Sequence, residues 1–245
     1  MEYINNCLNI NFQNSMLNKL DFVWSTTKGY SSLYPLYNNM KIKGLNVSIH
    51  KVYKLSLRNR KLAKNLSKLI IIAYDQPLER LEKSGWRGKF IYIEHGLSPM
   101  KYYTYKYEFF HRATILFYPG EIFKRKMEKL NSNFKNGLLG GYPKIDDLLE
   151  IKINKIELCQ IYNLDESKPI ILFAPSWGGK RNKDAGIHNA KYLKNIKNLI
   201  IVPHSADYKL AKKYKAIIPV DGNINEFLQL SDIVISDISS VLAEA

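Results

Sequence analysis

Two histidines follow strand-like segments of the sequence, at places where polar side chains can meet a ligand. His95 comes after the apolar run 91–93, and His204 comes after the run 200–202. An imidazole changes its charge near neutral pH, so either ring suits a general base acting on a hydroxyl group. A histidine at such a position can equally serve as a hydrogen-bonding group within a loop. The residues alone leave both interpretations open.

The final segment, DIVISDISSVLAEA at 232–245, combines an acid and two serines with the start of a helix. Asp237 follows the apolar run, and Ser239 and Ser240 come before the helical residues. The unpaired N–H groups and the positive dipole end of a helix N-terminus attract phosphate, and serine hydroxyls can add donors. A helix cap that binds no ligand is the alternative interpretation of the same residues.

Three further turns contain residues suited to a close approach of backbone and ligand. Gly96 follows His95, and Gly141 lies in the segment LLGGYPKID at 138–146. Glycine permits sharp turns without a side chain in the way. Ser176 begins the segment SWGGKR at 176–181, whose glycines and cations suit a phosphate-binding loop, although it is not a Walker sequence. A structural turn or a solvated loop remains the alternative in each case.

Short apolar, β-branched runs precede these residues and must position them. Most of these runs are apolar throughout rather than alternating between apolar and polar residues. Strands buried on both faces of a parallel sheet have this pattern. Amphipathic stretches at 56–68, 121–131 and 224–231 separate some of the runs and predict helices. The strand-like runs are 21–25, 45–50, 68–74, 89–95, 113–119, 136–143, 169–177, 198–205, 215–220 and 232–237. Alternation of strand and helix predicts an α/β fold with parallel, doubly wound sheets.

The region 141–169 contains no strand-like run and predicts a boundary between two Rossmann-like domains. We expect an N-terminal domain at 1–145, a connection at 146–164 and a C-terminal domain at 165–245. The second domain would hold about four strands and end in a short helix, so we expect it to be incomplete.

Composition narrows the classes of partner. The 245 residues have a formal net charge of +15, which favours polyanionic partners. The cations are spread along the chain, so we do not expect nucleic-acid binding. No apolar run approaches the roughly 20 residues that span a bilayer, and no signal peptide is recognisable. Two cysteines far apart, Cys7 and Cys159, fit no metal or disulfide spacing, so we expect no metal and a cytoplasmic protein. We also expect no cofactor.

Five motifs occur in one order: His-Gly at 95–96, GYPKID at 141–146, ILFAPSW at 171–177, VPHS at 202–205 and INEFLQLSDIVISDISSVLAEA at 224–245. This succession resembles the CDP-glycerol glycerophosphotransferase family of teichoic-acid and capsule synthesis. The resemblance covers about residues 90 to 245. It implies a GT-B fold, with an acceptor-side first domain, a donor-binding second domain and the donor in the cleft between them.

The resemblance also implies roles for single residues. His95 matches a base that acts on the acceptor hydroxyl, and His204 matches a histidine that contacts the donor phosphates. Ser239 and Ser240 match a serine pair that holds the diphosphate, and Asp237 matches the acid before that pair. Ser176 belongs to the same expected donor site, and Gly96 and Gly141 to the acceptor-side turns. The sequence departs from the family pattern at Ser205, after the second histidine, and at Ile238, where an aromatic residue is common.

The implied reaction moves glycerol phosphate, or a related polyol phosphate, from a CDP-linked donor to a hydroxyl of a polymer or lipid-linked acceptor. The basic surface would hold the enzyme against anionic lipid at the inner face of the plasma membrane. The SSVLAEA ending is also similar to nucleotide-sugar enzymes of the same fold, where a glutamate such as Glu244 reaches the ribose. A nucleotide-sugar glycosyltransferase, a UDP-sugar 2-epimerase-like enzyme and an inactive remnant therefore remain alternatives.

Overall fold

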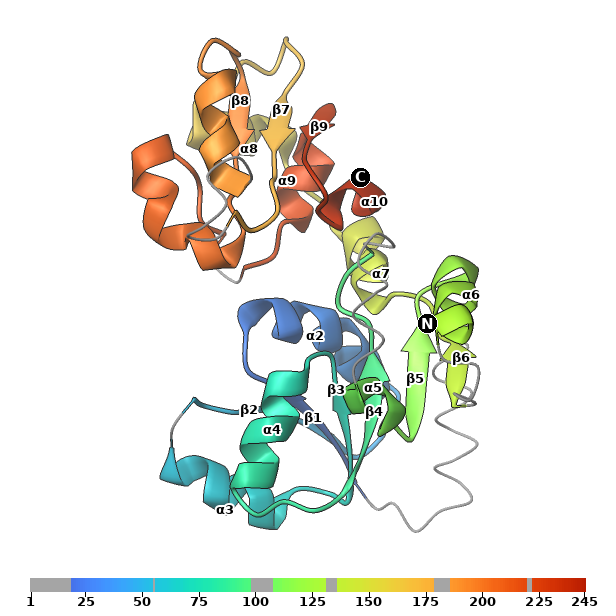
Figure 1. The fold of residues 1–245 in the computed structure, drawn as a ribbon. Helices are drawn as coiled ribbons and strands as arrows, with labels where there is room; N and C mark the ends of the chain where they lie inside the picture. The colour runs from blue at the N-terminus through green and yellow to red at the C-terminus, as the bar shows by residue number, and fades with distance from the viewer. Residues whose placement is uncertain (1–18, 55, 98–107, 131–135, 179–185, 220–221) are drawn as a thin grey trace. The chain divides into compact units, whose positions relative to one another are not determined.

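The structure is a computed structural model of the chain and describes residues 19–54, 56–97, 108–130, 136–178, 186–219 and 222–245. The chain divides into two compact units, residues 1–146 and 147–245. The division falls inside helix α7 (Pro143–Glu150), so this helix belongs to both units. Each unit contains one parallel sheet (Figure 1).

The first unit is built on a six-stranded sheet with the order β2-β1-β3-β4-β5-β6, and every neighbouring pair is parallel. The order reverses between β1 and β3, which is the switch point of a doubly wound sheet. The strands are β1 (Leu20–Trp24), β2 (Val47–Lys51), β3 (Leu69–Ile72), β4 (Lys89–Ile93), β5 (Ile115–Tyr118) and β6 (Gly137–Leu139).

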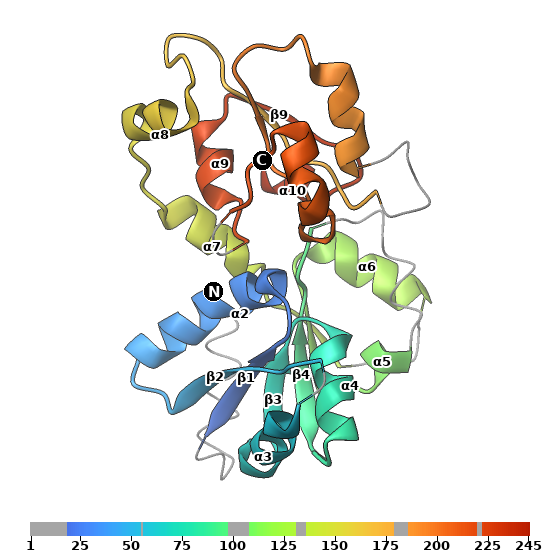
Figure 2. The same ribbon diagram turned by 90° about the vertical axis from the view of Figure 1, so that its left-hand side faces the viewer.

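Helices cover both faces of this sheet (Figure 2), which is why its strands are apolar on both sides. On one face Ile71 packs with Leu33 and Met40 of α2, and on the other face Ile70 packs with Leu78 of α4. The helices of this unit besides α7 are α2 (Thr27–Ile42), α3 (Leu57–Asn65), α4 (Asp75–Lys83), α5 (Glu108–His111) and α6 (Glu121–Leu130).

The second unit contains a three-stranded parallel sheet with the order β8-β7-β9. Its strands are β7 (Ile171–Phe173), β8 (Leu199–Ile201) and β9 (Ile233–Ile235). Its helices are α8 (Lys155–Tyr162), α9 (Asn225–Leu230), α10 (Val241–Glu244) and the 3₁₀ segments η2 (Gly186–Leu193) and η3 (Ser205–Tyr214). Ile170, Leu172, Ile200 and Phe227 form the centre of its core.

Prolines make several strands shorter than the apolar runs that predict them. The run 169–177 forms a strand only at Ile171–Phe173, between Pro169 and Pro175, because proline donates no ladder hydrogen bond. The predicted strand at 215–220 is wrong within the described residues 215–219, which contain no strand. This segment still lies beside β8, since the Ile217 N–H donates to the Ile201 carbonyl at 2.8 Å.

No helix within the described ranges is long and apolar enough to cross a membrane.

A buried carboxylate connects the first three strands. Asp21 of β1 is fully buried and accepts hydrogen bonds from His50 Nε2 at 2.8 Å and from the Ser67 N–H at 2.7 Å. Lys19 Nζ lies 2.9 Å from the same carboxylate. Burial raises the pKa of Asp21, but these three partners lower it more strongly, to a value of about 2 from an ordinary 3.8. The ionised Asp21 therefore stabilises this end of the sheet.

We predict that Asp21→Asn removes about 2 kcal/mol of stability at neutral pH and flattens the acid limb of the stability curve. The lowered pKa means that the contribution is complete above pH 3.8, declines as the pH falls below it and is lost below about pH 2. The measurement is urea unfolding at several pH values in a Trp177→Phe background, where fluorescence reports Trp24 and Trp86 of the first unit.

The exposed Glu79→Gln serves as the control for removing one carboxylate. If the stability of Asp21→Asn fell as steeply at acid pH as that of the unchanged chain, the stabilising role of ionised Asp21 would be contradicted.

Candidate active site

The carboxyl ends of β3 and β4 bring Tyr74 and His95 together in the first unit. The two rings are stacked, with centroids 3.8 Å apart and planes inclined by 26°. Burial raises the pKa of the Tyr74 hydroxyl, and the carboxylates of Glu94 and Asp75 raise it further. Tyr74 is therefore a neutral platform that fixes the plane of the imidazole.

Hydrogen bonds orient the imidazole of His95 within that plane. Its Nδ1 lies 3.1 Å from the Tyr92 hydroxyl and 3.3 Å from Glu94 Oε1. The nearby carboxylate favours the proton on Nδ1, so the lone pair of the neutral ring is on Nε2. Glu94 also accepts the backbone N–H of His95 at 2.9 Å. These contacts give His95 the tautomer that a general base acting through Nε2 requires.

The turn before α7 holds the backbone of the same histidine. Gly141 has a φ of +76°, a conformation that favours glycine. The next residue, Tyr142, is buried and donates its hydroxyl to the His95 carbonyl at 3.3 Å. Gly96 follows directly after His95. The GYP segment therefore supports the histidine, and the acceptor-side role of Gly96 and Gly141 stays a prediction.

In the second unit, Asp237 connects the carboxyl ends of β9 and β7. Its carboxylate accepts the Ser176 N–H at 2.7 Å and the Ser176 hydroxyl at 2.9 Å. The Gly186 N–H lies at 3.3 Å from the same carboxylate. Ser176, which is 6% exposed, therefore gives its donor to Asp237. This pair holds the loop in place, and the donor-site role expected of both residues stays a prediction.

The same loop is fixed a second time near Gly178. The Gly178 N–H donates to the buried Asp207 at 3.2 Å. Gly186 has a φ of +68°, and a Cβ atom there would lie 2.4 Å from Gly178 N. The two glycines thus allow two backbone segments to touch. Residues 179–181, the other part of the predicted phosphate loop, lie outside the described residues.

His204 caps the 3₁₀ segment that follows β8. Its Nδ1 accepts the Ala206 N–H at 3.2 Å, which leaves the proton of the neutral ring on Nε2. An imidazolium would have to donate at both nitrogens, so this hydrogen bond belongs to the neutral ring. In this form His204 offers an N–H donor, which suits a phosphate oxygen.

Ser239 and Ser240 lie at the start of α10, as predicted from the sequence. Ser239 Oγ lies 3.5 Å from the Val241 N–H, at the limit of a capping hydrogen bond. Ser240 and Glu244 are each 7% exposed. Of the two serines, Ser239 is therefore the more accessible to a ligand, and Glu244 is largely covered.

The residues of these arrangements that sequence reasoning missed include Tyr74, Tyr142 and Gly186. Tyr74 and Tyr142 lie 21 residues before and 47 residues after His95, so only the sheet brings them to it. Gly186 could be recognised only by its contact with Gly178. Among the described residues, no group of three or more His, Cys, Asp or Glu side chains could hold a metal ion.

Two α/β units, each with a parallel sheet, are typical of the GT-B fold, and similar solved structures confirm this fold class. The chain is similar to the wall teichoic acid polymerase TagF, with a TM-score of 0.61 and 18% identity over 95% of this chain and 69% of that chain. It is also similar to S. aureus MnaA in a UDP co-structure, with a TM-score of 0.60 and 13% identity over 92% and 75%. A third similar structure is a putative UDP-N-acetylglucosamine 2-epimerase from Listeria monocytogenes, with a TM-score of 0.55 and 15% identity over 91% and 75%.

The family model described as CDP-Glycerol:Poly(glycerophosphate) glycerophosphotransferase matches residues 12–244. The chain belongs to this family and is a transferase of the glycerophosphotransferase type. The predicted resemblance is thereby confirmed, and it begins well before the residue 90 where the motifs first indicate it. No curated protein sequence matches the chain.

We predict that Gly186→Ala destabilises the second unit by about 1–3 kcal/mol, because the new Cβ meets the Gly178 backbone and the positive φ disfavours alanine. Gly44→Ala is the matched control, since Gly44 also has a positive φ of +78° but nothing lies within 4 Å of its Cβ position. Calorimetric melting curves measure the difference. Equal losses in the two variants would show that contact with Gly178 has no energetic role.

Proposed function

We propose that the chain transfers glycerol phosphate, or a related polyol phosphate, from a CDP-linked donor to a hydroxyl group of a growing polymer or lipid-linked acceptor. The oriented imidazole of His95, in a chain of this family, is the observation that supports the proposal most directly. One of the similar structures is TagF soaked with CDPG.

In the proposed reaction, His95 Nε2 takes the proton of the acceptor hydroxyl as its oxygen attacks the phosphorus that bears glycerol. The bond from that phosphorus to the bridging oxygen of the diphosphate breaks, and CMP leaves with the electron pair. One phosphodiester forms for each phosphoanhydride broken. Glu94 and Tyr74 act as positioning residues, since they set the tautomer and plane of His95.

Charge that develops on the departing phosphate needs donors that are already in place. We assign this role to His204 through Nε2–H and to Ser239 at the start of α10. Ser240 completes the proposed pair. Asp237 and Ser176 act indirectly, because their hydrogen bonds hold the loop that follows β7.

We predict that His95→Ala lowers CMP release from CDP-glycerol in the presence of acceptor by roughly 10²- to 10⁴-fold, the usual contribution of a general base. Binding of CDP-glycerol, measured by calorimetry, should change only a few-fold, because the base acts on the acceptor. His111→Ala, at an exposed position of α5, is the control and should keep full activity.

The same assay separates the alternatives. Tighter binding of UDP-N-acetylglucosamine than of CDP-glycerol would favour a nucleotide-sugar enzyme, with Glu244 at the ribose. Binding of neither nucleotide, with no CMP release, would indicate an inactive remnant. Unchanged CMP release in His95→Ala would contradict the assigned base.

We further propose that the first unit contacts anionic lipid through one face of α2. Tyr30, Tyr34 and Tyr37 follow helical spacing, and neighbouring ring centroids are 5.1 and 6.1 Å apart. Trp24 adjoins Tyr30 at 5.0 Å, and Lys41 lies over the Tyr37 ring. Aromatic rings beside lysines suit the interface between lipid headgroups and hydrocarbon.

We predict that Tyr34→Ala combined with Lys41→Gln reduces binding to phosphatidylglycerol vesicles by at least about fivefold, since one lysine near an anionic surface contributes about 1 kcal/mol. Sedimentation with vesicles measures the bound fraction. Leu57→Ser is the control, because Leu57 is 79% exposed but lies on α3. Equal binding of the double variant and the unchanged chain would exclude this face as the contact.

A further inference from the structure

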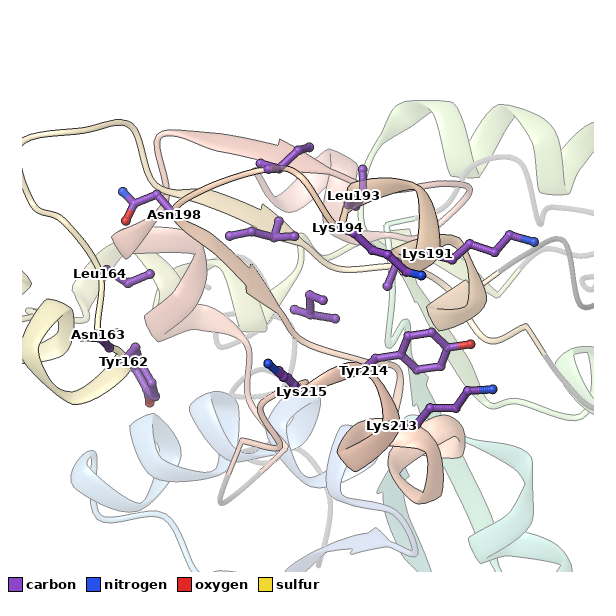
Figure 3. Close-up of a pocket in the computed structure, with 14 residues that line it drawn as sticks. Tyr162, Asn163, Leu164, Lys191, Leu193, Lys194, Asn198, Lys213, Tyr214 and Lys215 are labelled. Carbon is purple, nitrogen blue, oxygen red and sulfur yellow. The ribbon is translucent and has the colours of Figure 1, made fainter.

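A cavity of about 540 Å³ lies in the second unit, away from the proposed donor residues. Its walls come from the end of α8, from η2, from β8 and from the end of η3 (Figure 3). Asn198, which lines the cavity, lies before β8, whereas His204 follows that strand. The cavity therefore reaches the amino end of β8, opposite the end at which His204 lies. We call it the lysine groove, after Lys191, Lys194, Lys213 and Lys215.

The charged side chains that line the lysine groove are all positive. Four of its lining residues are lysines and none is acidic. All four are exposed: Lys191 lies on η2, Lys213 lies on η3, and Lys194 and Lys215 directly follow these two segments. Within the described ranges, no ion pair involves any of them. Four cations around one cavity without a neighbouring carboxylate attract anions, and a concave shape strengthens the local field.

Besides the lysines, the walls also contain apolar and aromatic side chains. Leu164, Leu193 and Leu199 line the cavity together with Tyr162 and Tyr214. A ligand that fits must therefore offer phosphate-like charges to the rim and small carbon groups to the walls. A simple inorganic anion would use only the first feature.

The groove is held in shape by contacts among its own walls. His188 Nδ1 lies 3.0 Å from the Tyr214 hydroxyl, which connects η2 to the end of η3. Asn198 accepts the Asp165 N–H at 2.8 Å and donates to the carbonyls of Asp165, Lys168 and Pro169 at 3.0–3.1 Å. These bonds join the segment before β7 to the segment before β8. The cavity is thus formed before any ligand binds, which lowers the entropic cost of binding.

The backbone is also strained at this place. The non-glycine residues with positive φ among the described residues are Asn163, Asn198 and Lys215, and all three line the groove. Asparagine tolerates this conformation, but for lysine it costs about 1–2 kcal/mol. Strain of this kind persists where the surrounding structure imposes it, and here it occurs at a lysine that lines the groove.

We propose that the lysine groove binds a phosphodiester chain of the acceptor polymer, at a second site apart from the proposed transfer site. The identity of the polymer rests on the proposed function, since poly(glycerophosphate) is the polymer named for this family. Its phosphates would contact the lysines, and its three-carbon units would lie against the leucines and tyrosines. A bilayer surface fits less well, because it is flat and cannot enter a recessed cavity.

The test uses the whole chain and a fluorescent oligo(glycerol phosphate), with binding followed by anisotropy at several salt concentrations. The variant combines Lys194→Met, which keeps most of the apolar stem, with Lys215→Gly, which removes the ammonium and relieves the positive φ. Its melting temperature should not fall. Lys197→Met with Lys209→Met is the matched control, because both lysines are exposed, lie nearby and do not line the groove.

We expect the groove variant to bind the oligomer about 25-fold more weakly at low salt, at about fivefold per lysine, and to show a shallower dependence of log K on log salt. The control should bind almost as the unchanged chain does. Equal affinity of the two variants would overturn the proposal, because it would leave only a diffuse attraction between a basic protein and an anion.

Two other results would also overturn it. One is competition by CDP for the oligomer in the unchanged chain but not in the groove variant, which would make the groove a nucleotide site. The other is lysine-dependent binding to phosphatidylglycerol vesicles without binding to the oligomer, which would make it a lipid site.

The assay contains no donor, so its outcome does not depend on whether the chain transfers glycerol phosphate. A failed transfer assay with intact oligomer binding would reject the proposed function alone.

Discussion

All neighbouring strands in both sheets pair in parallel, and this pairing shapes both units. A parallel strand must be followed by a crossover before the next one, and each crossover places a helix on a face of the sheet. The strands are therefore buried on both sides, and the polar residues of each unit are displaced to the strand ends. Tyr74 and His95 meet for this reason, since they follow adjacent strands of the first sheet. Ser176 and Asp237 meet for the same reason in the second.

Carboxylates that accept backbone N–H groups then fix the loops that this arrangement creates. Asp237 holds Ser176, Asp207 holds Gly178, and Asp232 accepts the Ile170 N–H before β7. Each of these bonds satisfies a loop donor that the sheet does not use, and an ionised acceptor strengthens the bond. In the first unit Asp21 has the same role near the amino ends of the strands. The candidate site thus rests on acids that need not touch a substrate.

The two ends of the second sheet differ in character. Its carboxyl end has tightly fixed loops, a capped 3₁₀ segment and two glycines in backbone contact. The lysine groove extends to its amino end and combines cations, leucines and tyrosines in a preformed cavity. An enzyme that extends a polymer handles a small donor and a long, charged product. Separate surfaces for donor and chain would allow the product to stay bound while a new donor enters.

Patterns in the sequence were enough to predict the α/β class, the parallel sheets, the glycerophosphotransferase family and the positions of His95 and His204 at strand ends. These features depend on local patterns, namely apolar runs, helical spacing and short motifs, which one chain displays in order. Only the tertiary structure decided that Ser176 gives its donor to Asp237, that Tyr74 stacks on His95 and that Gly186 touches Gly178. It also excluded a strand at 215–219 and gathered four lysines, from two 3₁₀ segments and the residues directly after them, into one groove. Such contacts join residues up to 61 positions apart, and no local pattern encodes them, because burial and close approach arise only once the sheets have formed.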